Sequence, residues 1–187
     1  MERSDAELVR LSRQGDRNAF QELVERYQRK IYTMLLGMLR DHETAWEASQ
    51  ETFLKALRSL EHFKGEASFY TWLYRIAVNV AIDLQRREAH RPIVGVADET
   101  VEAQETVQDA LHREDPFRHV QRRELGARVR AAIEQLTPEH RAAILLREVE
   151  GLSYEEISRV MGCAKGTVMS RLHYARRKLQ ALLKDCL

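Results

Sequence analysis

Apolar residues recur along most of the chain at the three-to-four-residue spacing of an α-helix. Asp16 can cap one helix, and Asp41 and Ser68 can cap the two that follow it. The helix after Asp16 has its apolar positions at Phe20, Leu23, Val24, Tyr27, Ile31, Met34 and Met38. No segment shows the alternation of apolar and polar residues that is typical of a half-buried β-strand. The pattern therefore predicts an all-α protein.

The next two helices have their large apolar residues at helical spacing, and we expect these residues to point inward. In the helix after Asp41 they are Trp46, Phe53, Leu54, Leu57 and Leu60. In the helix after Ser68 they are Phe69, Trp72, Leu73, Ile76 and Val80.

The helical pattern stops between about residues 89 and 120. Pro92, Gly95 and Pro116 interrupt it, and residues 88–120 have 3 Lys/Arg against 8 Asp/Glu, a net charge of −5. Such a stretch is typical of a linker. The sequence therefore predicts two small helical domains, residues 1–88 and 121–187, joined by an acidic flexible linker, residues 89–120.

The second domain contains a helix, a short turn and another helix in the stretch "SYEEISRVMGCAKGTVMSRLHYARRKL". Ser153 and Glu156 form a capping box, and Gly162 can take the left-handed backbone that ends a helix. The second helix has one apolar face, formed by Val168, Leu172, Ala175, Leu179 and Leu182. This is the layout of a helix-turn-helix, whose second helix enters the DNA major groove.

The charge of that second helix favours DNA as its partner. The whole chain has a net charge of only +1, yet residues 165–184 hold six Lys/Arg and no acidic residue. A basic run alone is more often a solvated face, but together with the helix-turn-helix it indicates phosphate binding.

The first domain has an aromatic-rich segment, "FKGEASFYTWLYRIAVNVAIDLQRR". Phe69, Trp72 and Ile76 share a face and can belong to a core, whereas Tyr70 and Tyr74 need other partners. Two interpretations remain open: an ordinary aromatic core helix, or a surface that stacks unpaired bases while basic residues hold the backbone.

Other chemistry is not indicated by the sequence. Cys163 and Cys186 match no zinc or disulfide framework, and no signal segment or membrane-spanning run is present. Phosphate-binding glycine loops and metalloprotease or nucleophile motifs are also missing. We therefore expect a reduced, intracellular protein that is not an enzyme, binds no cofactor or metal and does not insert into a membrane.

The aromatic segment, "ASQETFLKALRSL" and "LTPEHRAAILLREVEGLSYEEISRVMGCAKGTVMSRLHYARRKL" together resemble the extracytoplasmic-function (ECF) group of bacterial RNA polymerase sigma factors. The resemblance implies a cytoplasmic transcription initiation factor with three kinds of partner. These are core RNA polymerase at its clamp and flap regions, promoter DNA in duplex and single-stranded form, and an anti-sigma factor. An operator-binding dimer is the alternative for a helix-turn-helix, but such a protein has no use for unpaired bases.

The resemblance also implies roles for particular residues. Those that face the polymerase clamp are Glu47, Gln50, Glu51 and Leu54. Those that contact the minus-ten element during strand opening are Phe63, Tyr70, Trp72, Tyr74, Arg75, Asn79, Arg86 and Arg87. Those that contact the minus-thirty-five element are Lys165, Thr167, Met169, Ser170, Arg171, His173, Tyr174 and Arg177. The family more commonly has a basic residue at positions 169 and 174, and an acidic or small one at position 46.

Overall fold

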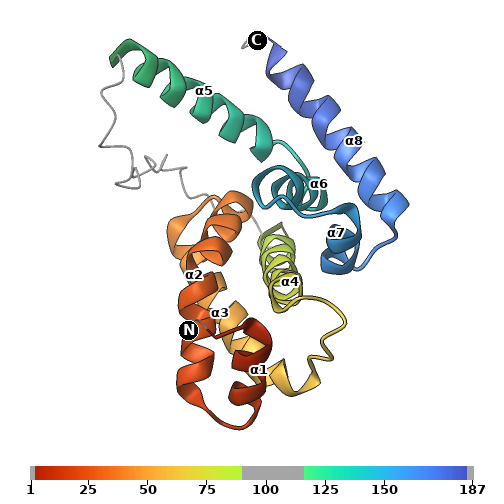
Figure 1. Cartoon of the computed structure of the whole chain (residues 1–187). Coiled ribbons are helices and arrows are strands. Elements are labelled where there is room, and N and C mark those ends of the chain that lie inside the picture. Colours follow the sequence, from red (N-terminus) through yellow and green to blue (C-terminus); the bar gives the residue numbers. More distant parts are fainter. Residues whose placement is uncertain (1–2, 90–115, 185–187) are drawn as a thin grey trace.

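The regular structure of the described part of the chain is entirely helical, as the sequence predicts (Figure 1). The computed structural model describes residues 3–89 and 116–184, with side chains in 3–89 and 124–184. Most of the predicted linker and Cys186 lie outside these residues. Within them, no helix combines the length and apolar character that a membrane span requires.

Four helices form the N-terminal part of the molecule. They are α1 (Asp5–Arg13), α2 (Arg17–Leu39), α3 (His42–Ser59) and α4 (Phe69–Ala89). The predicted caps are confirmed, since the side chains of Asp16, Asp41 and Ser68 each accept hydrogen bonds from backbone N–H groups of the following turn. A short 3₁₀ turn, η1 (Leu60–His62), ends α3 and leads into the loop before α4.

The predicted orientation of α3 is wrong for three of its large residues. Trp46, Leu54 and Leu57 are 55%, 53% and 47% exposed. The buried side of α3 instead consists mainly of small residues, with one large ring: Ala45, Ala48, Ser49, Thr52, Phe53 and Ala56. Small side chains let α2 and α4 approach α3 closely, so the larger apolar residues are left on the surface.

The C-terminal part contains the helix-turn-helix. Its elements are α5 (Pro116–Glu134), α6 (Pro138–Ile144), a π-helical turn η2 (Leu145–Val149), α7 (Tyr154–Met161) and α8 (Lys165–Leu182). The capping box of Ser153 and Glu156 is confirmed, and Gly162 has a left-handed φ of 59°. The buried face of α8 ends at Ala175, because α5 diverges from α8 and leaves Leu182 exposed (Figure 1).

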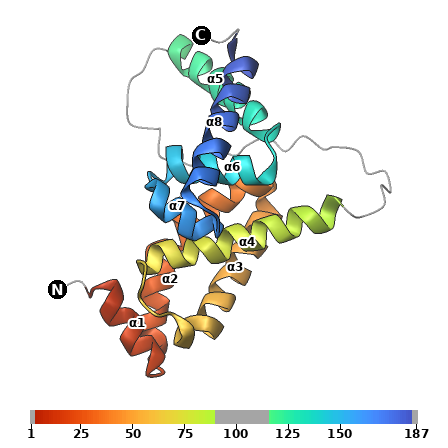
Figure 2. The same cartoon turned by 90° about the vertical axis from the view of Figure 1, so that its right-hand side faces the viewer.

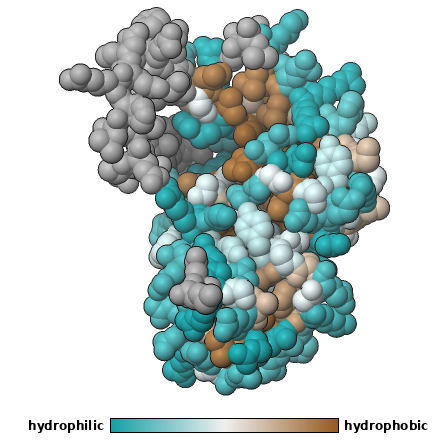
Figure 3. All heavy atoms as spheres, viewed as in Figure 1, coloured by the Kyte–Doolittle hydropathy of each residue, from teal (hydrophilic) through white to brown (hydrophobic). Residues whose placement is uncertain are grey.

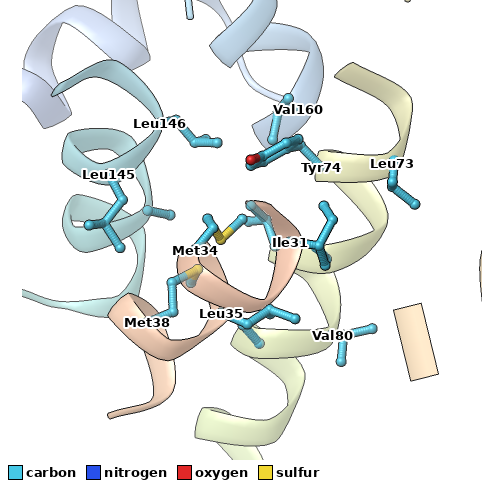
Figure 4. Packing of buried hydrophobic residues seen from close by; sticks show 14 of the residues in the cluster. Ile31, Met34, Leu35, Met38, Leu73, Tyr74, Val80, Leu145, Leu146 and Val160 are labelled. Carbon is cyan, nitrogen blue, oxygen red and sulfur yellow. The ribbon is translucent and has the colours of Figure 1, made fainter. Parts of the chain in front are cut away.

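The two helical sets pack against each other and share one continuous core. Helix α4 lies between the N-terminal helices and α7, as two perpendicular views show (Figures 1 and 2). Tyr74 reaches from α4 toward Leu146 and Val160 (Figure 4). On α2, Gly37 leaves room for Leu145, because a Cβ atom at Gly37 would lie 3.1 Å from a methyl carbon of that leucine. We call this packing of the two sets the closed arrangement.

A buried arginine joins the two sets by hydrogen bonds. Arg141 of α6 is only 3% exposed, and its guanidinium donates to the carbonyl of Met38 in α2 at 2.6 Å. It also donates to the carbonyls of Ile133, Glu134 and Leu136 at 3.2, 2.7 and 3.1 Å. Burial lowers the pKa of Arg141 to about 10, which still leaves it charged at neutral pH.

Candidate nucleic-acid interface

A pocket of about 310 Å³ lies between the α3–α4 loop, α4 and Arg159 of α7. We call it the loop pocket, and its lining is His62, Phe63, Lys64, Gly65, Glu66, Ala67, Thr71, Trp72, Arg75 and Arg159. Phe63 packs on Trp72 with ring centroids 5.0 Å apart, and both rings are partly exposed. Exposed Arg75 supplies a positive charge beside them. A half-open pocket with aromatic walls and a cation suits a flat, electron-rich ring on an anionic backbone.

Two other aromatic residues of the segment lie away from the loop pocket. Tyr70 and Tyr74 pack together with centroids 4.5 Å apart, on the side of α4 that meets the C-terminal helices. The Tyr70 hydroxyl donates to Glu150 at 2.8 Å, and burial raises the pKa of Tyr70 to about 12. Tyr74 is fully buried, which raises the pKa of its phenol, and its hydroxyl finds no hydrogen-bond partner among the described residues. In the closed arrangement, therefore, Tyr74 is inaccessible to nucleic acid, and the hydroxyl of partly buried Tyr70 is bonded to Glu150.

A second, smaller hollow of about 180 Å³ lies between α4 and the C-terminal helices. We call it the interface hollow, and its lining is Val78, Asn79, Ile82, Asp83, Arg86, Glu139, Met161 and Arg171. Arg86 forms an ion pair with Glu139 at 3.6 Å. The structure thus brings Asn79 and Arg171 to the same hollow, although the resemblance assigns them to different promoter elements. Arg87, the last basic residue of the segment, is exposed near the end of α4.

Most of the predicted duplex-contacting residues form an exposed face on α8. The exposed members are Lys165, Thr167, Met169, Ser170, His173, Tyr174 and Arg177. Only Arg171 is partly buried, and it donates a long contact of 3.5 Å to the Cys163 sulfur. The N-terminal half of α8 therefore offers polar, aromatic and cationic groups in the way that a recognition helix does.

Acidic residues of neighbouring elements balance part of the α8 charge. Lys165 pairs with Glu155 of α7, which lowers the pKa of that carboxyl. Arg176 donates to Glu148 of η2 at 2.7 and 3.1 Å, and Glu148 holds the guanidinium beside His173 and Arg177 along one hollow. Arg176 is a candidate that the sequence analysis missed. Its position in the basic run of residues 165–184 could have indicated it. Its spatial neighbours could not be read from the sequence.

A third candidate surface lies on α3. Glu47, Gln50 and Leu54 are exposed, Glu51 is partly exposed, and Glu51 pairs with Lys55 at 2.8 Å. Trp46 and Leu57 extend the same face at helical spacing, and Trp46 contacts Tyr32 edge to face at 6.2 Å. Apolar groups flanked by carboxylates thus form a ridge, which we call the α3 ridge and which consists of Trp46, Glu47, Gln50, Glu51, Leu54 and Leu57. Exposed apolar clusters of this kind mark protein-binding surfaces.

Comparison with known proteins identifies two family models along the chain. Residues 23–91 match the family model "Sigma-70 region 2", and residues 126–179 match "Sigma-70, region 4". The chain is 42% identical to the RNA polymerase sigma-H factor of Pseudomonas aeruginosa, with 97% of this chain and 96% of that protein covered. It is 40% identical to the ECF RNA polymerase sigma-E factor of Haemophilus influenzae, with 95% and 94% covered.

Two solved structures also resemble the model. The structure of CnrH in complex with the cytosolic domain of CnrY has a TM-score of 0.68 at 26% identity, and the match covers 95% of this chain and 96% of that one. The sigma factor RpoE in complex with the anti-sigma factor NepR from Bartonella quintana has a TM-score of 0.67 at 27% identity, with 88% and 96% covered.

Proposed function

The chain belongs to the ECF sigma factors, the non-enzymatic initiation factors that direct RNA polymerase to promoters through regions 2 and 4, and from this membership we propose a role for each of its surfaces. The region 2-like domain, residues 1–88, binds core polymerase and opens the minus-ten element. The region 4-like domain, residues 121–187, binds the minus-thirty-five element through α8. Both act in the bacterial cytoplasm, where the polymerase and the promoters are.

The loop pocket is the observation that carries the assignment to the minus-ten element. Phe63 and Trp72 offer ring faces to an unpaired base, and Arg75 lies where a phosphate would accompany that base. In-vitro transcription with core polymerase, followed by sequencing of the run-off products, tests the whole assignment. Defined start sites with a common upstream pair of elements would support it, and transcription that does not depend on this chain would reject it.

The surfaces for protein partners follow from exposed apolar groups. The α3 ridge fits the polymerase clamp, because exposed Leu54 lies among carboxylates that can meet basic groups. Hydrophobic residues also gather where α5 and α8 diverge (Figure 3), with Leu125 and Leu182 exposed there. We assign this apolar patch to the polymerase flap. An anti-sigma factor that covers it would exclude the polymerase, and the complex of the structural neighbour RpoE with the anti-sigma factor NepR supports such a partner.

Promoter binding requires the closed arrangement to open. Asn79 and Arg171 line one interface hollow, so a melted strand at Asn79 and a duplex at Arg171 cannot both be accommodated there. Tyr74 is also inaccessible while α7 covers it. We therefore propose that binding to polymerase separates the two domains, and that the free protein binds promoter DNA weakly.

Substitutions at the interface should shift this equilibrium. A leucine at Gly37 would collide with Leu145, so Gly37→Leu should favour the open form and raise the radius of gyration in small-angle X-ray scattering. The double variant with Leu145→Ala vacates the space and should restore compactness. An unchanged radius of gyration in Gly37→Leu, with the fold intact by circular dichroism, would argue against the closed arrangement in solution.

Substitutions in the two DNA-facing surfaces should impair different steps of transcription initiation. Asn79→Ala should leave closed binding, the binding of the holoenzyme to the unmelted promoter, largely intact. It should impair opening of the DNA strands, because an amide suits the edge of an unpaired base. Arg171→Ala should weaken closed binding by roughly 1–3 kcal/mol, since arginine suits a phosphate or a guanine in duplex DNA. Filter binding measures the first step, and permanganate reactivity of unstacked thymines measures the second.

A premelted template separates the two cases further. It should reduce the Asn79→Ala defect and leave the Arg171→Ala defect unchanged. Equal permanganate reactivity in the wild type and Asn79→Ala, or rescue of Arg171→Ala by premelting, would mean that the surfaces are assigned to the wrong steps.

A further inference from the structure

Arg13 makes long-range contacts that the assignments above leave unexplained. It is the last residue of α1 and precedes the stretch that matches region 2, residues 23–91. Its Nε donates to the carbonyl oxygen of Leu60 at 3.0 Å, and a terminal nitrogen donates to the carbonyl oxygen of Phe63. The guanidinium carbon also lies 5.9 Å from the centroid of the Phe63 ring. One side chain thus holds both ends of the turn that follows α3.

These contacts act where the chain leaves the helix. The Leu60 carbonyl also accepts the backbone N–H of Phe63 at 3.2 Å, so Arg13 is a second donor to it, and a cation near a helix C-terminus is favoured by the helix dipole. Phe63 is the first residue with an extended backbone, with φ −70° and ψ 107°. Fixing its carbonyl group therefore fixes the direction in which residues 64–67 depart.

The same turn forms one wall of the loop pocket. The Phe63 ring packs against Trp72 at 5.0 Å and against Phe69 at 6.1 Å, and Phe63 and Trp72 both line the pocket. Phe63 is only partly buried, so burial alone does not fix its position. Arg13 does not line the pocket itself, and any influence on it passes through Phe63.

We propose that Arg13 is a positioning residue for strand opening, which holds the Phe63 ring in the orientation that receives an unpaired base. The proposal rests on the assignment of the loop pocket to the minus-ten element. Arginine is suited to this task because its planar fork can donate to two acceptors in fixed directions. A lysine can replace the charge but not the fork.

The test compares Arg13→Ala and Arg13→Lys with Arg10→Ala, all assembled into holoenzyme. Arg10 lies on the same helix, and within residues 3–89 and 124–184 its side chain bonds only locally, to Gln14 at 3.3 Å, so its removal changes the charge equally without touching the turn. We expect Arg13→Ala to reduce opening, read by permanganate reactivity, roughly tenfold, as the loss of charge-assisted hydrogen bonds predicts. The opening by Arg13→Lys should lie between that of Arg13→Ala and that of Arg10→Ala. Binding of the holoenzyme to the unmelted promoter should be unchanged in all three variants.

A double-mutant cycle with Phe63→Ala separates positioning from a general loss of stability. If Arg13 acts through Phe63, the double variant should open no worse than Phe63→Ala alone. Multiplied defects, or Arg13→Ala behaving like Arg10→Ala, would overturn the proposal. So would a proportional loss of closed binding and melting temperature in both Arg13→Ala and Arg13→Lys. Normal opening by Phe63→Ala and Trp72→Ala would instead reject the pocket assignment itself.

Discussion

Changing Glu51 and Leu54 together to arginine should abolish assembly with core polymerase while leaving the chain folded. Leu54 is half exposed on the α3 ridge, and both substitutions place cations on a surface that we assign to the clamp. Truncation of a hot-spot interface residue costs about 2–4 kcal/mol or more, which is roughly 30- to 1000-fold in affinity. An inserted charge without a partner adds to that cost.

The fold should tolerate the same changes. Both side chains are accessible, and the main local penalty is repulsion between an arginine at position 51 and Lys55, about 0.2–0.5 kcal/mol for a like-charged helical pair. Circular dichroism and co-purification with core polymerase measure the two effects separately. Glu25→Arg is a matched control, because Glu25 is an exposed helical carboxylate on α2 that accepts a hydrogen bond from Gln21 at 2.9 Å. Normal co-purification of the double variant would remove the α3 ridge from the clamp interface.

The second large effect concerns stability. Arg141→Met should lower the free energy of unfolding by about 2–4 kcal/mol, because it removes the hydrogen bonds of a buried guanidinium and leaves the buried carbonyl of Leu136 without this donor. For a chain of this size that corresponds to a fall of roughly 4–16 °C in melting temperature. The carbonyl of Glu134 keeps a donor in Arg40. The carbonyl of Met38 keeps a donor in Gln85, at 2.7 Å, so the main loss falls on the C-terminal helices.

Arg128→Met provides the comparison for that measurement. Arg128 pairs with Glu124 at 2.9 Å on an exposed face of α5, and such pairs contribute about 0–1 kcal/mol. Differential scanning calorimetry of the two variants should therefore give well-separated transitions. If they melt together, Arg141 does not hold the C-terminal helices as its contacts indicate.

Local structure was predictable because it depends on neighbours in the sequence. Caps such as Asp41 and Ser153, and the left-handed Gly162, are read directly from short patterns. The orientation of α3 was not predictable, because its small residues and its large residues each form a stripe at helical spacing. Periodicity detects both stripes, but the packing of α2 and α4 decides which one is buried.

The candidate sites were predictable only as segments. The aromatic segment and the basic helix stood out, yet their residues divide among three different environments. Tyr74 is buried by α7, Phe63 lines the loop pocket, and Asn79 shares a hollow with Arg171. The contact of Arg13 with Phe63 spans 50 positions. Such relations arise from tertiary packing, for which local spacing carries no signal.

Because the chain is synthesised from its N-terminus, the two halves of the shared core become available at different times. The face of α4 that bears Tyr74 is complete at Ala89, but α7, which covers it, ends only at Met161. At about 5–20 residues per second, the intervening 161 − 89 = 72 residues take roughly 4–14 s to translate. During that interval the nascent first domain presents an uncovered aromatic face beside the ribosome. A chaperone or a polymerase that meets it then encounters a surface that the finished, closed protein no longer displays.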